Sequence, residues 1–387
     1  MRIGITCHPT YGGSGAVATE LGLKLASRGH EVHFISYAQP FRLSGFRERV
    51  FFHEVETEGY PLFEHAPYSL ALAVAIHETA VKHDLDVFHA HYAIPHATSA
   101  WIAREMLLPS RDLPIVTTLH GTDITLVGIQ PSFHSITRFS ILGSQGLTAV
   151  SEFLRDETVE GFGVPGERIK VIPNFIDTGR YRRDHEPCHR SSLAPSSEKI
   201  VMHVSNFRPV KRVTDVVEVF ARLLSSVPAR LVMVGDGPER PRALERAKEL
   251  GVEDKALFLG KHVSVDDLLS CCDLFVLPSE GESFGLAALE AMACGAPVVA
   301  SRSGGLPEVV AEGESGHLLP VGDVEGMASA AVAILSDEAT WRRMSGLARE
   351  TAVSCFEADK VVPVYEDLYR EVVASSSANP SPASEAR

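Results

Sequence analysis

The feature that most constrains this chain is an alternation of short apolar, β-branched runs with longer helical segments. In the first half the runs expected to form strands are RIGITC, EVHFISY, DVFHAHY, PIVTTLHG, GLTAVS and KVIPN. Helices are expected between them, for example over 14–28 and 68–83. Because the runs are continuously apolar, both faces of each strand should be covered, as in a parallel sheet with helices on each side. The first half therefore predicts a doubly wound α/β domain.

The alternation pauses over 177–197, a polar stretch with several serines and prolines, and then restarts. The second set of expected strands is KIVMHVSNF, RLVMVGDG, ALFLGK, DLFVLPS, PVVASRSG and GHLLP. This division predicts two domains, 1–180 and 181–360, with a final helix over 361–373 that packs back on the first domain. Residues 374–387 are rich in Ser, Pro and Ala and are expected to form a disordered tail.

Charge and composition narrow the class of partner. The formal net charge of −14 disfavours nucleic acid and anionic lipid, so small-molecule chemistry is expected. No run approaches the roughly 20 apolar residues of a membrane-spanning helix, and the start of the chain lacks the apolar core of a signal peptide. The six cysteines lack CxxC spacing. A cytoplasmic protein without membrane insertion is therefore expected.

The segment EGESFGLAALE, directly after the expected strand DLFVLPS, is the most informative in the chain. Glu282 lies in the loop, Ser283 is a plausible N-cap, the helix begins near Gly285 and Leu286, and Glu290 follows about two turns later. The free amides of a helix N-terminus suit a diphosphate, whereas carboxylates accept hydrogen bonds from sugar hydroxyls. The ordinary alternative is that Glu282 and Glu290 are solvent-exposed charges without a function, but apolar residues flank Glu290 in the sequence.

Two further strand ends carry candidates for an anionic ligand. The segment VSNFRPVKRV brings Arg208, Lys211 and Arg212 after the first strand of the second half, and a leaving diphosphate requires such cations. Lys211 is the first choice among them. The segment TYGGSG after the opening strand places Gly13 and Ser14 at a helix start, where an anion site and a merely tight turn are about equally expected.

Histidines follow the expected strands of the first half. His89 and His91 share one strand face through their spacing of two, and His120 lies in LHGTD. Without an accompanying cysteine or an EXXH pattern, hydrogen bonding to a ligand or burial in the core is favoured over zinc, so no metal is expected.

Several segments together resemble a known family. The Glu–seven residues–Glu spacing of EGESFGLAALE resembles the E-x7-E motif of retaining glycosyltransferases of family GT4, which have the GT-B fold. The resemblance covers almost the whole chain, because GGSG, LHGTD, VIPNFID, VSNFRPVK, MVGDGPE and FLGK follow in the family's order. Within the family, HPTYGGSGAVATELG, HAHYAIPHATSA and TTLHGTDITLVG resemble the N-acetylglucosaminyl L-malate synthases of bacillithiol biosynthesis.

This resemblance implies an architecture and an activity. It implies α/β architecture of the GT-B type, with two Rossmann-like domains facing each other across a cleft, the first binding the acceptor and the second the UDP-sugar. It also implies retaining, metal-independent transfer of N-acetylglucosamine from UDP-GlcNAc to L-malate, without a cofactor, as the first step of bacillithiol biosynthesis. A homodimer is expected on the same ground.

The resemblance also implies roles for individual residues. Lys211, Glu282 and His120 are expected to be catalytic. The residues expected to bind the donor are Gly13, Asn206, Lys211, Glu282, Phe284, Gly285, Leu286 and Glu290, with Glu290 at the ribose and Lys211 at the diphosphate. Because many relatives carry Arg where this chain has Asn206, diphosphate neutralisation is expected to depend more on Lys211, and the role of Arg208 stays open.

L-Malate is a dicarboxylate, so its site requires cations and hydrogen-bond donors. The candidates are Ser14, Tyr92, Thr118, Arg138 and Asn206. Arg138 stands alone as a cation in the apolar and hydroxyl-rich FHSITRFSIL, and an ordinary surface charge is its alternative.

Three other functions stay open at this point. The chain could be a GT4 enzyme for another acceptor, such as inositol phosphate or a glycan, a non-catalytic nucleotide-sugar binding protein, or a nucleotide-sugar epimerase. A phosphorylated acceptor should require more basic residues near GGSG than the sequence provides. The complete set of Lys211, Glu282 and Glu290 favours catalysis over binding alone.

Overall fold

The computed structural model describes residues 1–10, 12–57, 66–184 and 189–378. By its contacts the chain divides into two compact units. The first contains Met1–Pro173 and the segment that begins at Asp359, and the second contains Asn174–Ala358. The division lies a few residues before the boundary that the sequence predicted at 180. The described cysteines, which exclude Cys188, are all free.

The first unit contains a parallel sheet of seven strands in the order β3-β2-β1-β4-β5-β6-β7. Its strands are β1 (Arg2–Thr6), β2 (Glu31–Ser36), β3 (Val50–Glu54), β4 (Val87–His91), β5 (Ile115–Leu119), β6 (Gly146–Ala149) and β7 (Ile169–Val171). The central strands β4 and β5 are buried at every position, which explains their continuous apolar sequences. The sequence prediction missed only β3, an edge strand with partly exposed side chains.

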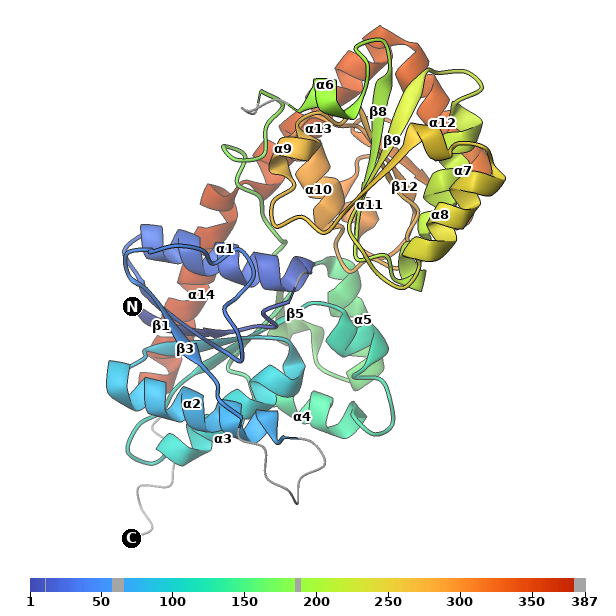
Figure 1. Ribbon diagram of the computed structural model, residues 1–387. Coiled ribbons are helices and arrows are strands. Elements are labelled where there is room, and N and C mark those ends of the chain that lie inside the picture. Colours follow the sequence, from blue (N-terminus) through green and yellow to red (C-terminus); the bar gives the residue numbers. More distant parts are fainter. Residues whose placement is uncertain (11, 58–65, 185–188, 379–387) are drawn as a thin grey trace. The chain divides into compact units, whose positions relative to one another are not determined.

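Helices cover both faces of this sheet, as Figure 1 shows. They are α1 (Gly13–Ser27), α2 (Tyr68–His83), α3 (Thr98–Leu107), α4 (His134–Gly143), α5 (Glu152–Phe162) and the C-terminal α14 (Ala358–Ala378), with short helical turns η1 (Ala93–Ala97), η2 (Thr122–Leu126) and η3 (Gly166–Arg168). Apolar side chains of α2 and α3 share one core cluster with strand residues such as Ile35 and Phe88 and with Val55, directly after β3. The opposite face packs against α1 and α14.

The helix α14 belongs to the first unit (Figure 1), and its residues Glu366 and Tyr369 bond to other parts of that unit. Its buried Glu366 accepts hydrogen bonds from Arg28 Nε and Nη2, each at 3.0 Å, and lies 2.9 Å from His30 Nε2. The Tyr369 hydroxyl lies 2.7 Å from His89 Nδ1 inside the core. The helix continues through Ala378, so the prediction of disorder is wrong for 374–378, while 379–387 lie outside the described residues.

The second unit contains a parallel sheet of six strands in the order β10-β9-β8-β11-β12-β13. Its strands are β8 (Lys199–Val204), β9 (Ala229–Val234), β10 (Ala256–Gly260), β11 (Leu274–Leu277), β12 (Val298–Ser301) and β13 (Gly316–Leu319). Each coincides with one of the apolar runs predicted as a strand.

Helices also surround the second sheet (Figure 1). The helices are α6 (Arg190–Leu193), α7 (Val213–Leu223), α8 (Arg240–Glu249), α9 (Asp266–Leu269), α10 (Leu286–Ala293), α11 (Leu306–Val309), α12 (Val324–Ser336) and α13 (Glu338–Phe356), with the turns η4 (Pro209–Lys211) and η5 (Glu253–Lys255). Helices α7, α8 and α12 bury apolar side chains in a common core with the sheet. The segments 177–184 and 189–197 of the predicted linker include one short helix, α6.

The structure confirms the predicted α/β class, with a doubly wound parallel sheet in each of two Rossmann-like units. Among the described residues, no helix is both long enough and apolar enough to cross a membrane.

Candidate functional site

In the second unit, the loops that follow β8 and β11 bring opposite charges together. Lys211 Nζ donates a hydrogen bond to Glu282 Oε1 over 2.6 Å, and Ser279 Oγ donates to the same oxygen over 2.9 Å. The Lys211 and Glu282 side chains are 19% and 13% exposed, so the pair is largely shielded but reachable. Both residues lie at the carboxyl edge of a parallel sheet, where ligands bind in such folds.

Glycines allow these loops to approach one another closely. A Cβ atom at Gly304 would lie 1.9 Å from the Glu282 carbonyl oxygen, and the Gly305 amide donates to that same oxygen over 2.8 Å. A Cβ atom at Gly235 would lie 1.8 Å from the Ser205 carbonyl oxygen. Gly235 and Gly304 also have positive φ angles, so other residues there would be strained. Gly304 and Gly305 thus pack closely against the loop of Glu282, and Gly235 packs against the loop of Ser205 after β8.

The backbone after β8 is itself strained. Phe207 has φ 42° and Arg212 has φ 48°, values that bulky residues rarely adopt and that often occur at ligand sites. Phe207 is fully buried, which fixes the loop from within. Asn206 Oδ1 is buried without a hydrogen-bond partner in the described part of the chain, whereas Arg208 is exposed.

The helix α10 begins where the sequence predicted. Gly285 precedes it with φ 101°, a left-handed conformation suited to glycine, and Leu286 is its first residue. Phe284 is buried, and its ring packs edge-on against Phe356 at 5.6 Å between centroids. Gly285 occupies the N-cap position, so the prediction of Ser283 as the N-cap residue is wrong.

Glu290 is buried in the second turn of α10 and has a partner that the sequence reasoning missed. Its Oε1 accepts a hydrogen bond from the Tyr181 hydroxyl over 2.7 Å, and Tyr181 is also buried. This hydrogen bond offsets part of the free-energy cost of burying a carboxylate. Tyr181 lies in the stretch interpreted as a linker, and no local pattern marks it.

In the first unit, Ser14 and Tyr92 come together at the carboxyl edge of the sheet. The Tyr92 hydroxyl donates to Ser14 Oγ over 2.8 Å. Ser14 lies in the first turn of α1, which begins at Gly13, so the free amides of a 15-residue helix lie beside this contact. Tyr92 has φ 90°, a strained conformation directly after β4.

His120 belongs to a buried group of histidines next to this contact. Its Nε2 lies 2.8 Å from His91 Nδ1, and its ring lies 5.2 Å from that of Tyr92. Burial is the main cause that lowers the pKa of His120 to about 3, and the charge of neighbouring His8 contributes in the same direction. His96 likewise has its pKa lowered to about 3 by burial. These rings are therefore neutral at physiological pH.

Asp123 holds the loops after β4 and β5 together, a role that the sequence interpretation did not assign. Its carboxylate accepts hydrogen bonds from the amides of Ala93 at 2.9 Å, Gly121 at 3.1 Å and His120 at 3.3 Å. Burial raises its pKa to about 6, although these amides act in the opposite direction. Its position in LHGTD, at a strand end, is the only sequence signal for this role.

Two predicted acceptor residues lie in other surroundings. Thr118 is fully buried, and its hydroxyl lies 2.7 Å both from His89 Nε2 and from Thr148 Oγ1. Arg138 is exposed on α4, and its Nε donates to the Phe162 carbonyl over 2.9 Å at the end of α5. The Thr118 backbone nevertheless lies beside Tyr92, whose amide donates a hydrogen bond to the Thr118 carbonyl over 2.9 Å.

The chain matches two models of glycosyltransferase families and a relative along nearly its whole length. Residues 11–180 match "Glycosyltransferase Family 4", and residues 184–351 match "Glycosyl transferases group 1". The N-acetyl-alpha-D-glucosaminyl L-malate synthase of Bacillus anthracis is 48% identical over 374 residues, which are 96% of this chain and 97% of that protein.

Solved structures of similar fold cover the same length. The sucrose-phosphate synthase of Thermosynechococcus elongatus has a TM-score of 0.79 at 21% identity, over 97% of this chain and 100% of that one. HepE of Anabaena, solved in complex with UDP and glucose, has a TM-score of 0.76 at 22% identity, over 98% and 100%. These likenesses support the GT-B fold. With the family matches and the 48% identical relative, they show that this chain belongs to the group 1 and family 4 glycosyltransferases.

Proposed function

We propose that this glycosyltransferase transfers N-acetylglucosamine from UDP-GlcNAc to the hydroxyl of L-malate with retention, giving GlcNAc-α-malate and UDP. This is the first step of bacillithiol biosynthesis. The name of the 48% identical relative supports the choice of donor sugar and acceptor. The observation that carries the proposal is the Lys211–Glu282 pair beside the start of α10. It joins a cation for phosphate and an acceptor for sugar hydroxyls in one place.

The second unit is proposed to hold the donor. Lys211 and the amides near Gly285 neutralise the diphosphate, and Glu282 accepts hydrogen bonds from the sugar. Glu290, oriented by Tyr181, accepts from the ribose hydroxyls. Asn206 Oδ1, which is buried and has no hydrogen-bond partner among the described residues, is a further acceptor for a hydroxyl of UDP-GlcNAc or of malate. Phe284 and Leu286 support the loop and the first turn of the helix.

Transfer breaks the bond between the anomeric carbon and the β-phosphate oxygen and forms one to the malate hydroxyl oxygen. The malate proton passes to the departing phosphate oxygen on the same face of the sugar, and the electron pair of the broken bond leaves with UDP. Negative charge develops on the phosphate, where Lys211 stabilises it more in the transition state than in the ground state. Glu282 faces positive charge on the sugar ring. A neutral His120 donates a hydrogen bond to the sugar near its C6 hydroxyl.

The first unit is proposed to bind the acceptor. The helix N-terminus at Ser14 and the hydroxyls of Ser14 and Tyr92 suit a malate carboxylate, while the Gly13 amide is proposed to contact the donor. Arg138 supplies a cation for the second carboxylate. The buried bonds of Thr118 favour a supporting role for it, through His89, over a direct contact.

Release of UDP tests the proposed function against its rivals. The chain is incubated with UDP-GlcNAc alone, with L-malate and with inositol 3-phosphate. Release that requires malate is the expected result. Release only with inositol 3-phosphate favours the other acceptor, and no release with either favours a binding protein.

The metal independence of catalysis has its own test. Lys211 and the helix amides supply positive charge at the diphosphate without a divalent ion, so activity should survive exhaustive chelation. Loss of activity that Mg²⁺ restores would contradict this part of the proposal. The absence of a cofactor, the homodimer and the cytoplasmic location stay predictions.

A further inference from the structure

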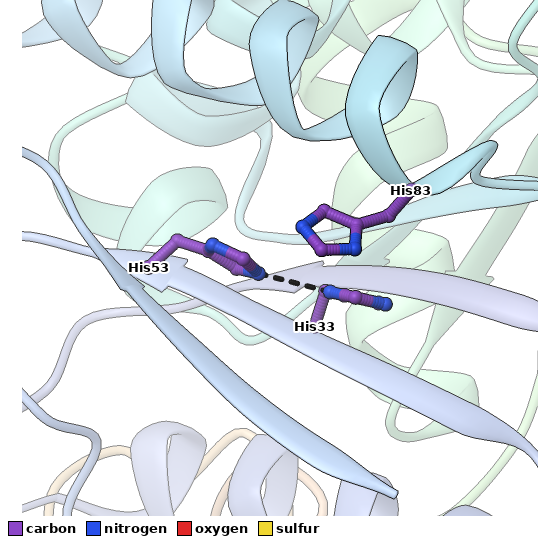
Figure 2. Close-up of side chains that lie close together, drawn as sticks. All are labelled: His33, His53 and His83. Atoms are coloured by element: carbon purple, nitrogen blue, oxygen red, sulfur yellow. Dashed lines mark hydrogen bonds between the residues drawn. The ribbon is translucent and has the colours of Figure 1, made fainter.

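Three histidines of the first unit meet at one edge of its sheet, away from the residues proposed for catalysis. His33 comes from β2, His53 from the edge strand β3 and His83 from the last residue of α2. One ring nitrogen of each lies within 4.8 Å of one ring nitrogen of the other two. Figure 2 shows the rings facing a common space, with a hydrogen bond between His33 and His53.

The fold explains why these side chains converge. Alternate residues of a strand face the same side of the sheet, and Ile35 and Val55 face the core beneath α2. His33 and His53 lie two residues before them and therefore share that face. The parallel register pairs Ile35 with His53, and the His83 ring at the end of α2 lies 4.5 Å from the His33 ring, measured between centroids. The proposed acceptor residues Ser14 and Tyr92 instead follow the strands β1 and β4.

Hydrogen bonds orient the His33 ring as in known metal sites. His33 Nε2 lies 2.9 Å from Glu31 Oε1, two residues earlier on the same strand face. A carboxylate accepts only, so Nε2 carries the proton and Nδ1 presents a lone pair toward His53. Metal-binding histidines commonly donate their other ring N–H to a carboxylate in this manner.

The distances suit a tetrahedral metal ion. A Zn–N bond of about 2.0–2.1 Å places two ligands of a tetrahedron about 3.3 Å apart. His33 Nδ1 and His53 Nε2 are 2.9 Å apart, so a small rotation would admit the ion. His83 Nε2 is buried without a hydrogen-bond partner in the described residues, which is costly for a polar atom unless something binds it.

We propose that His33, His53 and His83 bind one divalent transition metal ion of the zinc class, with Glu31 orienting His33 and a water completing the tetrahedron. The ion would tie the edge strand β3 to β2 and to the end of α2. Imidazole ligands favour zinc and its neighbours over Mg²⁺ or Ca²⁺, which prefer oxygen. This metal site is separate from the proposed catalytic residues, whose activity is expected to survive chelation.

A metal ion can reach these three histidines from solvent. His53 and His83 are only partly buried, which leaves an ion a path to the site.

Zinc uptake by the full chain tests the proposal directly. The chain is prepared without a polyhistidine tag, and a chelator removes any bound metal. It is then titrated with Zn²⁺ by calorimetry at pH 7.5. One ion per chain is expected. His53→Gln and His83→Gln should each weaken binding at least tenfold, and Glu31→Gln should weaken it by about tenfold as an orienting residue. His262→Gln, an exposed histidine of the second unit, is the matched control and should bind as the wild type does.

Two readouts on the wild type keep the proposal testable if a variant fails to fold. Co²⁺ should give the strong visible absorption of a tetrahedral site, and Zn²⁺ should raise Tm because it binds only the folded chain. No uptake of Zn²⁺ by the wild type, or equal affinity in folded His53→Gln and His83→Gln, would overturn the proposal. Because uptake does not depend on glycosyl transfer, its failure and the failure of the proposed function are distinguishable.

Discussion

Lys211 Nζ lies 2.6 Å from Glu282 Oε1, so a cation after β8 and a carboxylate after β11 form a partly shielded ion pair. The strained backbone at Phe207 and the close approach of Gly304 to the Glu282 backbone fix the two loops. In the proposed reaction a diphosphate and a sugar bind on either side of this pair. Lys211 and Glu282 then each interact with the ligand, and the attraction between the two side chains becomes weaker.

Replacing Lys211 with Met tests its proposed action on the leaving diphosphate. We expect kcat to fall by about 10²–10³, as for loss of one donor to a developing anion, with a smaller change in KM for UDP-GlcNAc. Steady-state UDP release measures both. Lys248→Met, at an exposed lysine on α8 of the second unit, is the control and should leave kcat nearly unchanged. Equal losses in the two variants would contradict a specific role for Lys211.

Removing the hydroxyl of Tyr181 tests its proposed positioning of Glu290. Tyr181→Phe should raise KM for UDP-GlcNAc by about tenfold with little change in kcat, because ribose binding is the same in ground and transition states. Glu290→Gln should act in the same direction and more strongly. Tyr37→Phe, at a partly exposed tyrosine of the first unit, is the control. A lowered kcat with unchanged KM in Tyr181→Phe would argue against this assignment.

The pKa of His120 predicts a pH profile. Burial lowers it from the ordinary 6.5 to about 3, so the ring stays neutral as pH falls from 8 to 5.5. As pH falls below 6.5, the His120 ring becomes protonated in the unfolded chain but stays neutral in the folded chain. The folded chain therefore loses stability relative to the unfolded chain, while its His120 ring stays uncharged. We expect kcat/KM of the wild type and of His120→Gln to have parallel pH profiles between 5.5 and 8. A step near 6.5 only in the wild type would show a titrating His120.

The proposed carboxylate contact of Arg138 predicts a selective effect on the acceptor. Arg138→Met should raise KM for malate by about tenfold and leave KM for UDP-GlcNAc unchanged, since a charge-assisted bond is lost on one substrate only. Arg168→Met, another exposed arginine of the first unit, is the control. An unchanged KM for malate would show that Arg138 does not bind malate and is a surface residue that bonds to Phe162 at the end of α5.

The fold was largely predictable because buried parallel strands require continuous apolar runs. All six strands of the second unit follow such runs, whereas β3, partly exposed at the sheet edge, carries no comparable signal. The start of α10 was predicted from glycine and strand-end position. Residues 374–378 were expected to be disordered from composition, yet they continue a helix whose preceding turns pack in the core.

Side-chain partners were less predictable because tertiary packing decides them. Lys211 and Glu282 were both placed at strand ends, but their ion pair depends on the pairing of β8 with β11. Tyr181 reaches Glu290 from 109 positions earlier in the chain. Thr118 lies one residue before the end of β5, near where ligand-binding residues occur, and the period-2 pattern of a strand does not reveal that packing buries its side chain.

Proton NMR of the product tests the central claim most directly. The chain is incubated with UDP-GlcNAc and L-malate, and the anomeric signal and its correlation to malate C2 are recorded. The account predicts GlcNAc linked through the malate hydroxyl, with the small anomeric coupling of an α-linkage, and loss of this product in Lys211→Met. A β-linked product, or UDP and free GlcNAc formed equally with and without malate, would contradict it.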